Sequence, residues 1–400
     1  MPFSFFCTCP RGLETLLAEE LGEIAAQSRS LTVHRPIPAG VHCSGVMEDA
    51  WRINLHSRIA SRVLLRIAQG AYRNEDDIYR LAHSQAWESW FDVKKNMRVD
   101  VTSIQSPLKS IEFATLRVKD GVADRFRQQN GARPSVDTKA PDVRIAVFLD
   151  ARQATLYLDT SGESLFKRGW RTRTGEAPLR ENLAAGLLRA AGWRPGIPLL
   201  DPMCGAGTIL VEAAQISAGI PPGARRHFAF EQFHGFDVQR WQSIKNACSH
   251  QTVPTTPLLF GSDISGDMLR VTKHNLASAG IPFDIPLKQI EAQEIRPPTD
   301  TAGIILTNPP YGERIDVRGE RTVDDKVVQF YQHLGTTLKQ RFPGWTIFLF
   351  TADMSAPRLL RLKESRKTPF YNGPIECRLF RFDMVAGSNR KKRDDANTAD

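Results

Sequence analysis

The chain has 400 residues, of which 41% are hydrophobic, so it is long enough for two or three domains with cores of their own. Lysine and arginine outnumber aspartate and glutamate by 53 to 44, and the resulting net charge of +9 favours polyanionic partners without identifying one. No run of about 18 apolar residues occurs, and the N-terminus has no basic stretch followed by an apolar core. We therefore expect a cytoplasmic protein without a membrane span or a signal peptide.

The six cysteines stand at positions 7, 9, 43, 204, 248 and 377 and form no C-x-x-C pair. We expect reduced thiols and no metal site, because zinc sites usually carry their ligands in such closely spaced pairs. The spacing of Cys7 and Cys9 is typical of a strand.

The first 160 residues predict two small α+β units. In the first, strands are expected at residues 3–9 and 41–46, with one helix after Pro10-Arg11-Gly12 and another from Met47, and this unit ends near residue 65. The second has a helix at 76–81, a strand at 97–102, a helix at 115–129 and two strands at 143–149 and 154–159. The 115–129 helix is expected to bury Leu116, Val118, Val122, Ala123 and Phe126, and to carry Arg117, Lys119, Arg125 and Arg127 on its other side.

From about residue 161 strands alternate with helices, as in a parallel sheet with crossover connections. Strands are expected at 197–201, 258–264, 284–290, 302–307 and 345–351, and helices at 179–191, 209–218, 268–279 and 325–341. A hairpin is expected from Ile375 to Val385. The polar tail at 387–400 contains Arg390-Lys391-Lys392-Arg393 and is expected to be disordered.

A glycine-bearing loop, Asp201-Pro202-Met203-Cys204-Gly205-Ala206-Gly207-Thr208, follows the first of these strands. Glycines let a backbone turn tightly and approach a ligand, and ligands of such sheets bind at the carboxyl ends of the strands. The loop lacks the third glycine of the dinucleotide fingerprint, so an ordinary strand-to-helix turn is the alternative. Asp263, before Ile264, ends the next strand and suits either the two ribose hydroxyls or a helix N-cap. The two features together favour a nucleoside cofactor site.

A second loop, Asn308-Pro309-Pro310-Tyr311, follows the apolar run at 303–307. The proline after Asn308 holds the backbone extended and stiffens the loop. The side-chain carbonyl of Asn308 and the backbone carbonyl of Pro309 can accept both hydrogens of one NH₂ group, which frees the nitrogen lone pair of a base amine for attack. Tyr311 offers a face for stacking of a base. The pattern indicates methyl transfer to an exocyclic amine, and a plain Pro-Pro turn is the alternative.

Two further residues belong to these motifs, and the role of one stays open while the other is not expected to be catalytic. Arg314, after Glu313, suits either a substrate phosphate or a surface ion pair. Cys204 is not expected to be a nucleophile, because cytosine C5 methylation uses a Pro-Cys pair where this chain has Pro310-Tyr311.

These motifs resemble those of the bacterial THUMP-domain methyltransferases that modify the N2 amine of guanine in large-subunit (23S) ribosomal RNA. The matching stretches are 9–14, 116–120, 159–162, 168–171, 177–181, 201–208 and 307–314. The resemblance extends to about residue 385 and is to the N-terminal half of two-headed enzymes. Their guanine-N7 methyltransferase half is expected to be absent.

The resemblance implies a ferredoxin-like segment at 1–65, an RNA-binding THUMP domain at 66–160 and a Rossmann-like class I methyltransferase domain at 161–386, an α/β fold preceded by α+β units. It implies S-adenosyl-L-methionine as cofactor and RNA, ribosomal RNA first, as partner. The implied cofactor residues are Asp201, Pro202, Cys204, Gly205, Gly207, Thr208, Asp263, Ile264 and Glu291, where Glu291 would supply the acid that many relatives carry after the third strand. The implied catalytic residues are Asn308, Pro309, Pro310 and Tyr311, and the implied RNA contacts are Arg117, Lys119, Arg168, Arg171, Arg173 and Arg314.

Three alternatives remain open at this point: an amino-methyltransferase for tRNA, a DNA adenine-N6 methyltransferase, which shares the Asn-Pro-Pro-Tyr loop, and a non-catalytic RNA-binding or assembly protein. The front units favour RNA over DNA, and the two intact loops favour catalysis. Guanine is selected by the resemblance alone.

Overall fold

The structure, a computed structural model, describes residues 2–171, 179–247, 257–309 and 325–385. Several predicted features lie outside the described residues: Arg173, Pro310, Tyr311, Arg314 and the polar tail. Within the described ranges, no helix is both long enough and apolar enough to cross a membrane.

The N-terminal half is built on one seven-stranded sheet with the order β2-β3-β1-β4-β7-β6-β5. Its strands are β1 (Phe3–Thr8), β2 (Thr32–Ile37), β3 (Gly40–Gly45), β4 (Arg62–Ala71), β5 (Met97–Ser103), β6 (Val143–Leu149) and β7 (Gln153–Asp159). The helices are α1 (Glu14–Ala25), α2 (Met47–His56), α3 (Glu75–His83) and α4 (Ile111–Asn130), with a short 3-10 turn, η1 (Trp87–Ser89). Only β5 and β6 pair in parallel among these described strands.

Strand β4 joins the two predicted front units into this one sheet. Its residue Leu65 pairs with Phe5 of β1 on one side and with Leu158 of β7 on the other. The predicted boundary at residue 65 therefore falls inside a strand that both units share.

Helix α4 begins at Ile111, earlier than expected, because Ser110 accepts a hydrogen bond from the Phe113 N–H and caps it. Its buried stripe runs through Ala114, Val118, Val122 and Phe126 at four-residue spacing. Leu116, which was predicted to belong to this stripe, is 46% exposed, because it lies two residues away from the stripe's register.

The C-terminal half contains a second seven-stranded sheet with the order β10-β9-β8-β11-β12-β14-β13. Its strands are β8 (Leu199–Asp201), β9 (Leu259–Asp263), β10 (Leu287–Gln289), β11 (Ile304–Thr307), β12 (Thr346–Thr351), β13 (Arg366–Asn372) and β14 (Ile375–Asp383). The helices are α5 (Glu181–Ala190), α6 (Thr208–Ser217), α7 (Val238–Ala247), α8 (Gly266–Ser278), α9 (Asp325–Arg341) and α10 (Ala356–Leu360), with a 3-10 turn, η2 (Ala229–Gln232). The five strands β8 to β12 pair in parallel, and β14 runs antiparallel to β12.

The strand order reverses at β8. From β8 the chain proceeds to β9 and β10 on one side, and β11 then pairs on the other side of β8. In open α/β sheets such a switch point leaves a crevice at the carboxyl ends of the strands.

The predicted hairpin from Ile375 to Val385 is wrong. Residues Ile375–Asp383 form the single strand β14, whose hairpin partner is the preceding strand β13, with Asn372 paired to Ile375. The turn is at Gly373, where φ is +63°. The two turn residues are Gly373 and Pro374, and a glycine at the first central position is a common feature of two-residue hairpin turns.

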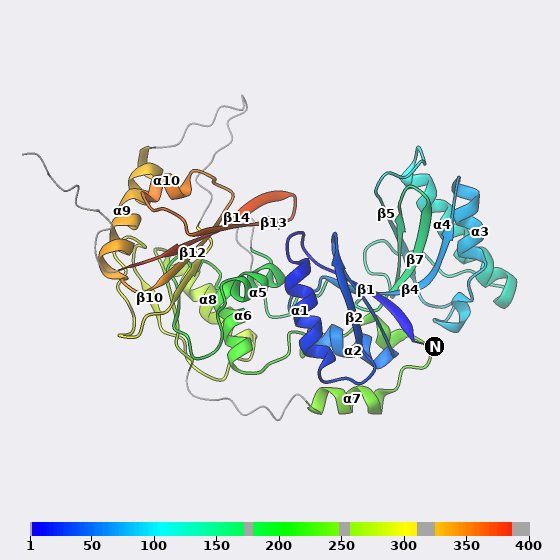
Figure 1. Cartoon of the computed structure of the whole chain (residues 1–400). Coiled ribbons are helices and arrows are strands. Elements are labelled where there is room, and N and C mark those ends of the chain that lie inside the picture. The colour runs from blue at the N-terminus through cyan, green and yellow to red at the C-terminus, as the bar shows by residue number, and fades with distance from the viewer. Residues whose placement is uncertain (1, 172–178, 248–256, 310–324, 386–400) are drawn as a thin grey trace, which may run out of the picture.

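The two halves are joined along α2 and the long segment between α6 and β9. Figure 1 shows α7, from this segment, beside α2 of the N-terminal half. Trp51 of α2 stacks on Phe230, with ring centroids 5.5 Å apart, and meets Trp241 edge-on. Arg226 of the same segment donates to the backbone carbonyls of Ser164 and Glu163. The long segment between α6 and β9 of the C-terminal half thus packs on the N-terminal half.

A buried ion network crosses the same junction. Glu212 of α6 accepts hydrogen bonds from Arg58 (3.4 Å) and from Arg168 (3.1 Å), and its side chain is fully buried. Because buried charges are costly unless paired, this network requires the two halves to stay together.

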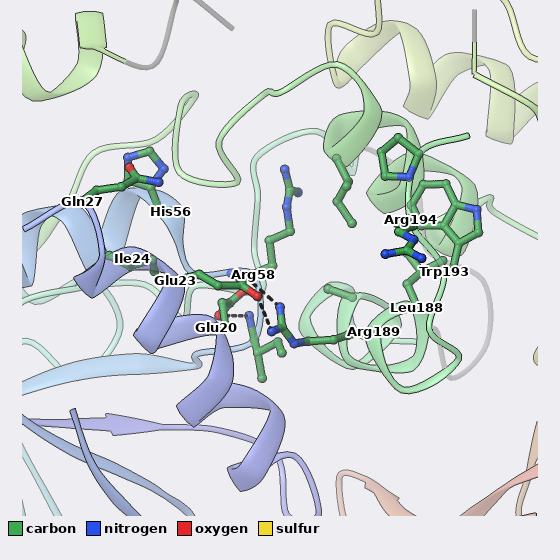
Figure 2. Close-up of a pocket in the computed structure, with 14 residues that line it drawn as sticks. Glu20, Glu23, Ile24, Gln27, His56, Arg58, Leu188, Arg189, Trp193 and Arg194 are labelled. Carbon is green, nitrogen blue, oxygen red and sulfur yellow. Dashed lines mark hydrogen bonds and ion pairs between the residues drawn. The ribbon is translucent and has the colours of Figure 1, made fainter. Parts of the chain in front are cut away.

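A cavity of about 300 Å³ lies at this junction, between α1 and α2 on one side and α5 on the other. Figure 2 shows the residues that line it. Glu20 accepts hydrogen bonds from Ser57 Oγ (2.6 Å) and from the Arg58 N–H (2.9 Å), although burial raises its pKa. Arg189 binds Glu23 across the gap at 2.6 Å. The Glu23–Arg189 pair therefore joins the two halves, whereas Glu20 binds the end of α2 within the N-terminal half.

Candidate functional site

A second cavity, of about 720 Å³, lies at the switch point of the second sheet. Strands β8, β9 and β11 end beside one another, with Asp201 paired to Gly261 and Leu200 to Ile305. The loops that follow these strands therefore meet at one edge. The cavity is lined by Arg171, Leu179, Asp201, Pro202, Met203, Cys204, Gly205, Ala206, Thr208, Ile209, Asp263, Ile264, Met268, Glu291, Ala292, Gln293, Asn308, Pro309 and Phe330.

The structure thus brings most of the predicted cofactor residues into one cavity. Gly207 is not among the lining residues, but its φ of +76° shapes the loop. A Cβ at this position would come within 2.5 Å of Thr272 Cγ2. Thr272 donates to the Gly205 carbonyl (2.7 Å) and Asn275 donates to the Ala206 carbonyl (2.9 Å), so α8 holds the loop from outside.

Asp201 is a buried acid at the floor of this cavity. Burial raises its pKa to about 7, and nearby Asp263 adds to the rise, while hydrogen bonds from Thr307 and Met203 oppose it. Thr307, the last residue of β11, donates its hydroxyl to Asp201 Oδ1 at 2.9 Å. This bond ties the glycine loop to the strand that leads into Asn308.

Asp263 supports two loops with its two oxygens. It accepts one hydrogen bond from the Gly205 N–H and one from the Ser265 N–H, both at 2.9 Å. The N-cap of α8 is Ser265, which accepts from the Met268 N–H, so the N-cap alternative for Asp263 is not what the structure shows. Each oxygen has capacity for a further hydrogen bond, and Asp263 lines the cavity beside Ile264, which is 65% exposed.

Glu291 follows β10 and lines the same cavity, exposed and hydrogen-bonded to Gln293 (2.6 Å). Asn308 and Pro309 line the cavity from the end of β11, Asn308 half-buried and Pro309 buried. The acids and the Asn-Pro loop therefore line one cavity from the ends of four strands, β8, β9, β10 and β11.

Cys204 lies in the wall of this cavity with a buried thiol. Burial raises its pKa, and Asp201 and Asp263 raise it further. A neutral thiol at this place fits its predicted role as a loop residue and not a nucleophile.

The predicted RNA contacts fall into two groups. Arg117 and Lys119 lie on α4, partly exposed, where Arg117 pairs with Asp76 (2.6 Å) and Lys119 with Asp120 (3.0 Å). The prediction that Arg168 faces RNA is wrong, because its side chain is 1% exposed and bound to Glu212. Arg171 lines the switch-point cavity instead of an outer surface.

Motif reasoning missed several lining residues, among them Met203, Met268 and Phe330. Met203 lies within the predicted loop, but Met268 and Phe330 come from helices α8 and α9. Helical periodicity marks such residues as apolar and does not show which cavity they face. No group of three or more His, Cys, Asp or Glu side chains suited to a metal occurs in the described part of the chain.

Comparisons with known proteins agree with this arrangement. The family described as "RMKL-like, methyltransferase domain" matches residues 168–381, a THUMP domain matches 72–159, and an RlmL ferredoxin-like domain matches 4–64. The ribosomal RNA large subunit methyltransferase K/L of Shewanella frigidimarina is 36% identical over 97% of this chain and 54% of its own length. The chain thus spans about half the length of the curated relatives that it matches.

Solved structures match over nearly their whole length. SMU.472, crystallised in complex with SAH, is 27% identical with a TM-score of 0.84, over 97% of this chain and 99% of that one. A predicted N6-adenine-specific DNA methylase from Listeria monocytogenes is 26% identical with a TM-score of 0.84, over 96% of this chain and 97% of that one.

The strand order, the reversed strand β14 and the switch-point cavity define a Rossmann-like methyltransferase fold behind an α+β N-terminal half. The chain belongs to the family of RMKL-like methyltransferases. The predicted fold class and family are both confirmed.

Proposed function

We propose that this chain is an S-adenosyl-L-methionine-dependent methyltransferase that modifies the N2 amine of a guanine in large-subunit ribosomal RNA. The observation that carries the proposal is the meeting of the Asp201 loop, Asp263 and Asn308-Pro309 around one cavity of about 720 Å³. We place this activity in the cytoplasm, where ribosomal RNA is made and assembled in bacteria.

The residues of the cavity fit this cofactor. Asp263 can accept hydrogen bonds from ribose hydroxyls at its remaining acceptor positions, and the exposed Ile264 offers an apolar face for the adenine. The glycine backbone at 205–207 admits close approach of the amino-acid part. When bound, the cofactor supplies an electrophilic methyl group on a sulfonium.

The chain's own residues would prepare the amine. The side-chain carbonyl of Asn308 and the backbone carbonyl of Pro309 accept its two hydrogens, which turns the nitrogen lone pair out of conjugation with the ring. Their position at the rim of the cavity would hold the amine in line with the methyl group. The proton leaves after transfer, so no strong general base is required.

The choice of RNA is supported by the matched THUMP domain and by the name of the curated relatives. DNA adenine is a second candidate, because the Listeria protein carries that description at 26% identity. The two candidate functions are distinguished by whether RNA or DNA accepts the methyl group.

The test uses the full chain with tritiated S-adenosylmethionine. Wild type should label ribosomal RNA and yield N2-methylguanosine on nucleoside mass mapping. Asn308→Ala should lower methyl transfer by at least about 100-fold, since it removes an acceptor used in the transition state, and should keep cofactor affinity within twofold. Label in duplex DNA alone would overturn the RNA assignment, and equal activity of wild type and N308A would overturn the role of the loop.

A further inference from the structure

Arg171 enters the switch-point cavity from the segment before α5, and three partners fix its guanidinium. Its Nε donates to Glu181 Oε1 (2.8 Å), and its Nη2 donates to Thr208 Oγ1 (2.8 Å) and to the Leu179 carbonyl (3.1 Å). The side chain is 12% exposed. With three hydrogen bonds holding its head group, the side chain has little freedom to reach an outer surface.

The remaining nitrogen, Nη1, is buried and has no hydrogen-bond partner among the described residues. A buried donor without an acceptor is costly, and natural structures seldom leave one unless a ligand or water takes it. Nη1 itself is out of contact with solvent, but the Arg171 side chain is 12% exposed and lines the cavity, so an anion bound there lies beside its positive charge.

The charges of the cavity identify the kind of acceptor. Three acids line it, namely Asp201, Asp263 and Glu291, and Arg171 is the only cationic side chain among its described lining residues. S-adenosylmethionine carries two positive groups, the sulfonium and the ammonium, and one negative group, the carboxylate of its amino-acid part. The carboxylate needs the cation, and a guanidinium N–H is a strong partner for it.

The position of Arg171 agrees with this pairing. Thr208, which it contacts, is the first residue of α6 and directly follows the glycine loop. The positive end of the α6 dipole lies at the same place and adds to the attraction for an anion.

We propose that Arg171 binds the carboxylate of the amino-acid part of the cofactor and so selects nucleosides that carry it. This inference rests on the proposed function, because it assumes that S-adenosylmethionine is the cofactor. It replaces the prediction that Arg171 contacts RNA.

The experiment is calorimetric titration of the full chain with S-adenosylmethionine and with its decarboxylated analogue, which lacks only the carboxylate. Wild type should bind the intact cofactor roughly 10- to 100-fold more tightly, the usual range for a lost charged hydrogen bond. Arg171→Gln should lose affinity for the intact cofactor by the same factor and keep its affinity for the analogue within twofold. Arg180→Gln, nine residues along, exposed and not among the cavity's described lining residues, is the matched control and should bind both like wild type.

The outcomes separate the competing explanations. Equal wild-type affinity for the two ligands would overturn the inference. This comparison needs no variant, so the inference can be tested even if R171Q folds poorly. If R171Q lowers the affinity for both ligands equally, Arg171 has a purely structural role. If R171Q leaves the cofactor affinity unchanged and weakens RNA binding, Arg171 contacts RNA instead. A wild type that binds neither ligand would refute the proposed function itself.

Discussion

At the scale of single residues, the switch-point cavity contains one carboxyl group that is almost fully buried. Asp201 ends β8, is 2% exposed and has a pKa raised to about 7 by burial. Its acceptor oxygen serves both Thr307 and the backbone of Met203. The folded chain therefore holds a proton on this residue over a pH range in which the unfolded chain has released it.

This difference predicts a pH-dependent effect of Asp201→Asn. Between about pH 4 and pH 7 unfolding releases the proton, so the free energy of unfolding falls as pH rises, by about 1.4 kcal/mol per pH unit for one such group. Asparagine keeps the acceptor oxygen and cannot ionise. The midpoint of D201N should therefore rise relative to wild type from pH 5 to pH 8 in thermal unfolding.

Other buried acids, such as Glu20 and Glu181, also have raised pKa values, but they are the same in both proteins and cancel in the comparison. A constant difference between wild type and D201N across this range would show that Asp201 is ionised throughout.

At the scale of elements, helix α6 connects the switch-point cavity to the junction between the halves. Its first residue, Thr208, is bound by Arg171 in the cavity, and Glu212, one turn later, is bound by Arg168 in the junction. Arg168 and Arg171, two of the arginines that the family resemblance assigned to RNA, both bind this one helix. The cavity and the N-terminal half are thus fixed by the same element.

Glu212→Gln should lower the free energy of unfolding by about 3–5 kcal/mol, because it leaves two buried guanidinium groups without their countercharge. Urea unfolding monitored by tryptophan fluorescence measures the change. Glu163→Gln is the control, since its ion pair with Lys167 is exposed and should contribute less than about 1 kcal/mol. A shift for E212Q no larger than that of E163Q would show that the buried network does not stabilise the junction.

At the scale of the whole molecule, α3 and α4 lie at one end and the second sheet at the other, with α1 and α2 between them (Figure 1). An RNA that reaches both α4 and the cavity must extend along the molecule. The net charge of +9 favours such a partner, although Arg117 and Lys119 already have acidic neighbours.

If α4 contacts RNA phosphates, Arg117→Ala should weaken RNA affinity and reduce the salt dependence of log K by about one unit per lost contact. Cofactor affinity should not change. Filter binding at several salt concentrations measures the salt dependence of log K for wild type and for R117A. Arg80→Ala is the control, since Arg80 is an exposed arginine on neighbouring α3 that is paired with Asp77. If R117A and R80A lose the same RNA affinity, the attraction is one of general charge. If neither variant loses RNA affinity, α4 does not contact RNA.

The sequence predicted most of the site because its signals are local. The loop after Asp201, the acid at Asp263 and the Asn308-Pro309 pair each sit at the end of a strand, and parallel strands bring their carboxyl ends to one edge. The hairpin was placed too late, because its turn lies at Gly373-Pro374, before the apolar residues of β14.

By itself, then, the sequence determined the fold class, the family and the three loops of the cavity, since each depends on residues close together in the chain. Only the tertiary structure decided that β4 belongs to both front units, that Arg168 is buried and that Arg171 faces the cavity. The physical reason is that an arginine's position depends on where its acceptors lie. Glu212 comes from a helix 44 residues beyond Arg168, and motif spacing carries no information about such a pair.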